Sequence, residues 1–273
     1  MIADPAAFEV IRPRSRHDAL VQLREAYADG TPLTPLAGGT DLLVAMNAGA
    51  IRAGRYLDIW GLDGLRGIEV EGRTLVLGAL TTWTDCIRSR DVRKHLPILA
   101  DAGREVGGAQ IQNRGTLGGN IGNGSPAGDS LPVLAAADAV VILESLDGSR
   151  EVPLVDYYTG YRATVRRPDE LITEIRVKPP RGRQVFRKVG TRAAQAISKA
   201  VMAAVGNQIA FGSVSATVVR ARRVEEYLAG GGNDLGEAQR LLAEDIAPID
   251  DVRSTAEYRR RVARNLLSLV IDR

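Results

Sequence analysis

The N-terminal part of the chain alternates apolar segments with glycine turns. Apolar residues recur at helical spacing through residues 16–29 and Gly30 follows as a stop signal, so this segment is predicted to be an amphipathic helix. The next segment, PLTPLAGGTDLLVAMNAGAI, begins as a short apolar strand, turns at a glycine pair, and becomes apolar again after Thr40 and Asp41, either of which could cap a helix. This pattern predicts a strand, a glycine turn and a helix.

The pattern changes twice in the middle of the chain. Residues 55–83 alternate apolar and polar positions between glycine turns, which predicts several short strands. Residues 83–115 have a helical pattern, with Pro97 opening a second helix. A helix of small residues then precedes two predicted strands, at 139–145 and 170–177.

The C-terminal third begins with KPPRGR at 178–183, a predicted linker or loop because two prolines and basic residues disfavour regular structure. Residues 184–206 and 213–220 are predicted to form strands with exposed turns, although the first of these segments could be partly helical. The end of the chain has three helical segments, the last starting near Ser254. Together these elements predict an α+β protein of two domains that divide near residue 175.

Composition removes several function classes. The 273 residues are 45% hydrophobic and 25% charged, as expected for a globular protein. The single cysteine, Cys86, allows no internal disulfide, no four-cysteine zinc site and no iron–sulfur cluster within this chain, and we expect it in the core. The two histidines, His17 and His95, leave little material for metal binding or histidine-based catalysis.

Charge and hydropathy favour neither nucleic acid nor membrane as a partner. The net charge of +3 comes from arginines in short scattered groups, a pattern more typical of a solvated or partner-facing surface than of nucleic-acid binding. No run of about eighteen apolar residues occurs, and the start, MIADPAAFEV, lacks the features of a signal peptide. We therefore expect no membrane span and a cytoplasmic location.

Two glycine-rich stretches carry the strongest functional signal. The first is AGGTD at 37–41, and the second is RGTLGGNIGNGSPAGDS at 114–130, which has no regular apolar period. Glycine-rich backbone can adopt positive φ and bring several N–H groups onto one anion. Thr40 and Thr116 add hydroxyl donors. Because a diphosphate has two ends to hold, the paired stretches predict a diphosphate site.

The alternative is that both stretches are only tight turns. Residues 114–130 are longer than a turn needs, and a long polar segment without secondary structure in a compact domain is usually functional or disordered. Neither stretch matches a P-loop, and the nearest approach to the Rossmann fingerprint, at 122–127, does not follow a predicted strand. The prediction is therefore diphosphate binding outside both of those classes.

PLAGGTDLL and the later IQNRGTLGGNIGNGSPAGDSLPVLAAADA resemble the FAD-binding medium subunit of the molybdenum hydroxylases, the family that includes carbon monoxide, nicotine and xanthine dehydrogenases. The resemblance covers nearly the whole chain, through GALTTWTD, DELITEIRV, FRKVGTRAAQAISKAV and TAEYRRRVARNLL. It implies an α+β fold with a vanillyl-alcohol-oxidase/PCMH-like FAD-binding domain at 1–175, divided into subdomains of about 1–57 and 58–175. A smaller α+β domain of the CO dehydrogenase flavoprotein type would follow at 176–273 and cover the flavin.

The resemblance also implies which residues hold FAD. The diphosphate would lie against Leu36, Ala37, Gly38, Gly39, Thr40, Asp41, Leu42 and Leu43, and against Thr116, Leu117, Gly118, Gly119 and Asn120, with Ala79 and Thr81 nearby. Asp129 matches the family's acidic FAD ligand, Ile172 a backbone contact, and Lys188 the basic residue near the flavin ring. No histidine or cysteine lies in the glycine stretches, so we expect noncovalent FAD and no metal site in this chain.

Three of these positions have alternatives. Many relatives place a tyrosine against the isoalloxazine where this chain has Phe186, which keeps a stacking surface but lacks the hydroxyl. Asp129 could cap the helix that begins near Leu131. Lys188 could be a solvated strand residue, although a cation near the pyrimidine end of the flavin would favour its anionic reduced form.

The function implied by the resemblance is that of an oxidoreductase, as the FAD-binding electron-transfer subunit of a heterotrimeric molybdenum hydroxylase. A large partner would carry molybdopterin, a small partner would carry two [2Fe-2S] clusters that deliver electrons to FAD, and an external acceptor would receive them; two heterotrimers could pair. One alternative is a stand-alone FAD-dependent oxidoreductase acting on a small molecule, with Tyr157, Tyr158, Tyr161 or Lys188 handling protons. Another is an FAD-dependent sensor or scaffold.

Overall fold

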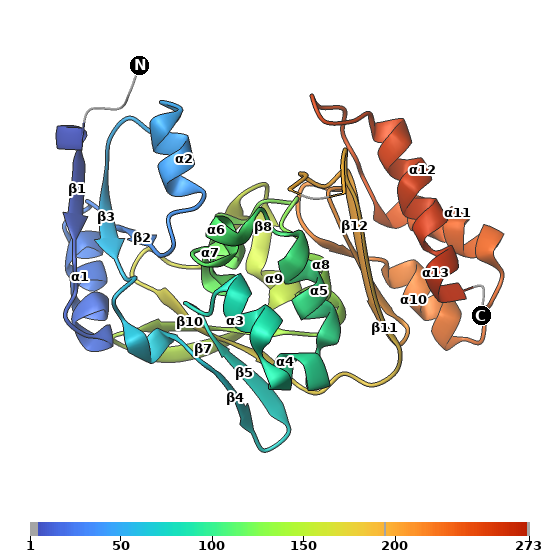
Figure 1. Ribbon diagram of the computed structural model, residues 1–273, viewed down its shortest axis with the longest axis horizontal. Coiled ribbons are helices and arrows are strands. Elements are labelled where there is room, and N and C mark those ends of the chain that lie inside the picture. The colour runs from blue at the N-terminus through green and yellow to red at the C-terminus, as the bar shows by residue number, and fades with distance from the viewer. Residues whose placement is uncertain (1–4, 194, 272–273) are drawn as a thin grey trace.

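The computed structural model describes residues 5–193 and 195–271, which form three units, each built around a sheet. Figure 1 shows the units side by side, with the N-terminal unit in blue, the central unit in teal, green and yellow, and the C-terminal unit in orange and red. No helix in the described ranges is long and apolar enough to cross a membrane.

The N-terminal unit is a parallel three-stranded sheet in the order β1-β3-β2. Its elements are η1 (Pro5–Ala7), β1 (Phe8–Ile11), α1 (Arg16–Ala28), β2 (Thr34–Leu36), α2 (Leu42–Asn47) and β3 (Gly54–Asp58). Helix α1 begins where the Ser15 side chain accepts a hydrogen bond from the backbone N–H of Asp18, and its Leu20 and Leu23 share a buried core with Leu57. The predicted helix and the strand, turn and helix that follow are confirmed.

The central unit is an antiparallel five-stranded sheet in the order β4-β5-β10-β6-β7, with helices packed against it. Its strands are β4 (Ile68–Glu71), β5 (Thr74–Gly78), β6 (Val140–Ser145), β7 (Gly148–Pro153) and β10 (Leu171–Val177), with a separate hairpin of β8 (Tyr158–Gly160) and β9 (Ala163–Thr164). Its helices are η2 (Asp63–Leu65), α3 (Trp83–Arg88), α4 (Arg90–His95), α5 (Pro97–Glu105), α6 (Ala109–Gln112), α7 (Leu117–Asn123), α8 (Ser130–Ala136) and α9 (Leu154–Tyr157). The predicted strands at 139–145 and 170–177 are confirmed.

Helix α7 corrects the expectation that residues 114–130 lack secondary structure. Thr116 caps this helix, and Leu117 and Ile121, four residues apart, are both fully buried. Because these two side chains join the main core, their packing outweighs the low helix propensity of the glycines between and beside them.

The C-terminal unit is an antiparallel sheet in the order β11-β12-β13-β14, with helices on its outer face. Its elements are β11 (Gln184–Val189), β12 (Ala200–Val205), β13 (Gln208–Gly212), β14 (Val219–Arg220), α10 (Arg222–Ala229), α11 (Leu235–Asp245), α12 (Ala256–Leu266) and α13 (Ser268–Ile271). Successive residues of β12 point to opposite faces, so Ala203 and Val205 join the main core while Met202 and Ala204 pack under the outer helices (Figure 1). The strands predicted within 184–206 are confirmed as β11 and β12, whereas only Val219–Arg220 of the segment predicted at 213–220 is strand, and β13 was not predicted.

Helix α8 joins the central and C-terminal units. All of its residues are buried, and it packs on β12, β13 and β14. At its C-terminal end, Arg220 donates to the carbonyl of Ala135 at 3.1 Å and pairs with Asp138 at 2.7 Å. Arg220 also pairs with Glu225 of α10, so a buried guanidinium holds the two units together.

Candidate cofactor site

The first glycine stretch links β2 to α2 at the edge of the N-terminal unit. Gly39 has a φ of +73°, a conformation that favours glycine, and its carbonyl accepts the N–H of Leu43 at 3.0 Å. At Gly38, a Cβ would lie only 1.7 Å from the carbonyl oxygen of Arg114. The two glycines therefore allow the first stretch to turn and to touch the second.

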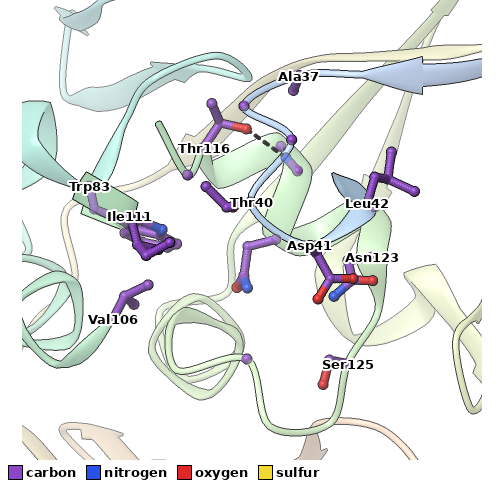
Figure 2. A pocket seen from close by; sticks show the side chains of 18 of the residues that line it. Ala37, Thr40, Asp41, Leu42, Trp83, Val106, Ile111, Thr116, Asn123 and Ser125 are labelled. Atoms are coloured by element: carbon purple, nitrogen blue, oxygen red, sulfur yellow. Dashed lines mark hydrogen bonds between the residues drawn. The ribbon is translucent and has the colours of Figure 1, made fainter. Parts of the chain in front are cut away.

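The second glycine stretch is fastened to the central unit through its main chain. The N–H groups of Leu117 and Gly118 donate to the carbonyls of Thr81 and Ala79, at 3.0 and 2.8 Å. The hydroxyl of Thr116 accepts the N–H of Gly119 at 3.0 Å, the capping bond drawn in Figure 2. These hydrogen bonds fix the stretch against the central unit.

Both stretches border one cavity of about 720 Å³ between the three units. Cofactor and ligand pockets commonly measure roughly 300–1,000 Å³. Figure 2 shows Ala37, Thr40 and Asp41 of the first stretch and Thr116 of the second around the same space. The predicted site residues that line the cavity are Ala37, Gly38, Gly39, Thr40, Asp41, Leu42, Ala79, Thr116, Gly118, Gly119, Asn120, Asp129, Ile172 and Lys188.

Five predicted residues are close in sequence to residues of the cavity wall but are not part of the described lining. They are Leu36, Leu43, Thr81, Leu117 and Phe186. Leu117 is fully buried in the main core, and the Thr81 hydroxyl donates to the carbonyl of Gly67. Leu43 is half exposed, and Phe186 packs against the main core from β11. Phe186 therefore contacts the core, and its stacking against the isoalloxazine stays a prediction.

Asp129 and Lys188 form a buried ion pair in the cavity wall. The Nζ of Lys188 lies 2.6 Å from Oδ2 of Asp129 and also donates to the carbonyl of Glu105 at 3.0 Å. Burial raises the pKa of Asp129 to about 6, against the opposing attraction of Lys188. The solvated alternative for Lys188 is wrong, because its side chain is 5% exposed.

The second carboxylate oxygen of Asp129 gives the site an open acceptor. Oδ1 is buried and has no hydrogen-bond partner among the described residues. Asp129 occupies the N-cap position of α8, but its side chain makes no capping hydrogen bond. A buried acceptor without a partner is uncommon, so a ligand donor in the cavity would complete this site.

Sequence reasoning missed several lining residues, some of them within the quoted segments and some outside them. Trp83 begins α3 and abuts Gly115, where a Cβ would lie 3.0 Å from its ring nitrogen. Val106 and Ile111 come from either side of the start of α6, and Figure 2 shows both near Trp83. Arg162 lines the cavity from the β8–β9 turn and donates to the Asn123 side chain at 2.7 Å. A tryptophan next to the GALTT segment was the available signal for Trp83.

The tyrosines considered for direct proton handling lie away from the cavity lining. Tyr157 is fully buried in the main core, and the Tyr158 hydroxyl donates to the carbonyl of Ile121 at 3.1 Å. Tyr161 is exposed. Cys86 is confirmed as a core residue, and burial raises the pKa of its thiol.

The geometry defines a class of protein. Two glycine stretches from different units meet at one cavity through a main-chain contact at Gly38, and a buried acceptor lies in the cavity wall. Backbone N–H groups of glycine-rich turns are suited to phosphate oxygens. The chain is therefore a cofactor-binding protein whose site fits an extended dinucleotide held at its diphosphate.

Comparison with known proteins identifies the family. Residues 6–180 match the FAD binding domain in molybdopterin dehydrogenase, and residues 186–273 match the CO dehydrogenase flavoprotein C-terminal domain. The chain belongs to this family; it is an oxidoreductase flavoprotein subunit whose cofactor is FAD.

Similar proteins are medium chains of dehydrogenases. The chain is 32% identical to the glyceraldehyde dehydrogenase medium chain of Sulfolobus acidocaldarius, over 96% of each protein. It is also 32% identical to the carbon monoxide dehydrogenase medium chain of Afipia carboxidovorans, over 98% of this chain and 97% of that protein. A solved structure of CO dehydrogenase from Oligotropha carboxidovorans superimposes with a TM-score of 0.90 at 30% identity, covering 100% of this chain and 98% of the other. The predicted α+β fold and the family are therefore confirmed.

Proposed function

We propose that this chain is the electron-transfer subunit of a heterotrimeric molybdenum hydroxylase. A large partner carries molybdopterin, and a small partner carries two [2Fe-2S] clusters; this chain accepts electrons from the clusters and passes them to an external acceptor. The medium-chain names of its relatives support a place within a larger complex. A cytoplasmic location and the pairing of two heterotrimers belong to the same proposal.

The observation that carries the proposal is the small number of acid–base groups in the cavity. Among the described lining residues, the titratable side chains are Asp41, Asp129, Arg162, Arg166, Lys188 and Arg253. Oδ2 of Asp129 is paired with Lys188, its Oδ1 is the acceptor that we assign to the flavin itself, and no described histidine, cysteine or tyrosine lines the space. Direct oxidation of a small molecule needs a positioned proton acceptor, whereas electron transfer does not. The lining therefore favours an electron-transfer role.

The residues present fit FAD. We place the diphosphate between Gly38–Thr40 and Thr116–Gly119, where glycine backbone is exposed to the cavity. We place the flavin ring toward Asp129 and Lys188, because Oδ1 of Asp129 can accept a hydrogen bond from a flavin N–H group and Lys188 supplies positive charge. Bound FAD supplies one- and two-electron transfer, and the protein binds and orients it.

The test is purification of the native complex through an affinity tag on this chain. We expect two further chains on a gel, and molybdenum, iron and FAD in the ratio set by one molybdopterin centre, two [2Fe-2S] clusters and one FAD. The visible spectrum should combine flavin and iron–sulfur bands. Flavin alone on a single chain would refute the proposal and favour the stand-alone flavoenzyme.

A further inference from the structure

A stack of tryptophan and arginine lies where the N-terminal unit meets the central unit. Trp60 follows β3, and two guanidinium groups lie over its ring: Cζ of Arg114 is 3.7 Å from the ring centroid, and Cζ of Arg66 is 4.2 Å from it. Arg66 donates to the carbonyl of Trp60 at 2.6 Å and to that of Leu80 at 3.3 Å. The indole of Trp60 is therefore fixed relative to the segment that precedes α3.

Arg114 connects this stack to both glycine stretches. It is the residue directly before Gly115, and its carbonyl oxygen is the atom that a Cβ at Gly38 would meet at 1.7 Å. The Arg114 backbone thus sets the gap between the stretches, while its exposed side chain rests on the ring of Trp60. Neither Trp60 nor Arg114 lines the cavity.

We propose that Trp60 and Arg114 are positioning residues for FAD, holding the two glycine stretches at the separation that its diphosphate requires. The attraction between a guanidinium and an aromatic face restrains the main chain at Arg114. A site that is held in its bound geometry loses less freedom when the ligand arrives, and so binds it more tightly. This inference depends on the FAD cavity and not on the electron partners in the proposed function.

The test measures the FAD dissociation constant of the full-length apoprotein by quenching of flavin fluorescence. Arg114→Gln removes the cation from an exposed position and should weaken FAD binding about two- to fivefold. Arg114→Lys retains a cation, so its FAD affinity should lie between those of Arg114→Gln and the wild type. Arg261→Gln is the matched control, since this arginine lies over the ring of Tyr258 at 5.4 Å, on α12; its FAD affinity should equal that of the wild type.

A double-mutant cycle separates positioning from a general effect on the fold. Trp60→Leu removes the aromatic face and should weaken FAD binding about two- to fivefold, like Arg114→Gln, whereas Trp60→Phe retains an aromatic face and should weaken it less. Adding Arg114→Gln to Trp60→Leu should cause no further loss, because the partner is already absent. Additive losses, or an FAD affinity that Arg114→Gln leaves unchanged, would overturn the proposal. If Trp60→Leu does not fold, the comparison of Arg114→Gln, Arg114→Lys and the control decides alone.

Discussion

A single methyl group at position 38 should separate the two glycine stretches. The Cβ of an alanine there would lie 1.7 Å from the carbonyl oxygen of Arg114. The obstructing atom is main chain, so no rotamer change can relieve the contact. Gly38→Ala is therefore expected to push the first stretch away from the second.

The size of the effect follows from that distance. Cβ atoms are essentially never found within 3.0 Å of a neighbouring heavy atom, so the separation must grow by at least 1.3 Å from the starting 1.7 Å. A hydrogen bond of about 2.9 Å stretched by that amount is lost. A hydrogen bond to a charged group contributes about 1.5–3 kcal/mol. Losing one bond to the diphosphate should therefore weaken FAD binding roughly tenfold to a hundredfold.

Isothermal titration of the apoprotein with FAD measures this loss directly. Gly61→Ala is the matched control, because a Cβ at Gly61 meets nothing within 4 Å. We expect unchanged FAD affinity in the control and a comparable far-ultraviolet spectrum in both variants. Wild-type affinity in a folded Gly38→Ala protein would show that the contact between the stretches does not set the diphosphate site.

Three further predictions concern the walls of the cavity and the joint between units. Gly119→Val places a branched side chain on the lining, so we expect folded protein that loses its flavin absorbance on gel filtration, and retained flavin would contradict the diphosphate assignment. The pKa of Asp129 is about 6 in the folded protein and near 3.8 when unfolded, so its stabilising contribution is complete below pH 3.8 and declines as the pH rises to about 6. Between pH 3.8 and 6, the urea midpoint of the wild type should fall relative to that of Asp129→Asn. If the midpoints of the two proteins change with pH in parallel, the prediction is wrong. Arg220→Met removes the buried guanidinium that pairs with both Asp138 and Glu225 and should lower the free energy of unfolding by about 3 kcal/mol, measured in urea.

Local patterns predicted those parts of the fold that depend on neighbouring residues. The helix at Arg16–Ala28 and the strand at Leu171–Val177 follow from periodicity and flanking breakers. Helix α7 was missed because its burial depends on the distant strand β10, which glycine content does not reveal. The position of β10 between β5 and β6 is likewise a long-range pairing that no local pattern specifies.

The candidate site also has parts that the sequence predicted and parts that it did not. Glycine motifs located the main-chain walls because close backbone approach requires glycine, as at Gly38 and Gly118. Two side chains that line the cavity were missed: Trp83 lies within GALTTWTD but was not singled out, and Arg162 lies in a segment with no motif. Phe186 shows the reverse case: the strand was located from its pattern, but the packing of this side chain against the main core is a long-range contact that the pattern does not give.

The C-terminal unit completes the cofactor site through one shared helix. At the N-terminal end of α8, Lys188 pairs with Asp129 in the cavity wall; at its other end, Arg220 holds the carbonyl of Ala135 and the side chain of Asp138. Buried ion pairs tolerate little displacement, because a charge that loses its partner remains desolvated. A shift of the C-terminal unit would therefore disturb both ends of α8 together. Because these contacts act on the same helix, the C-terminal unit must be docked correctly for the Asp129 acceptor to take its position in the cavity wall.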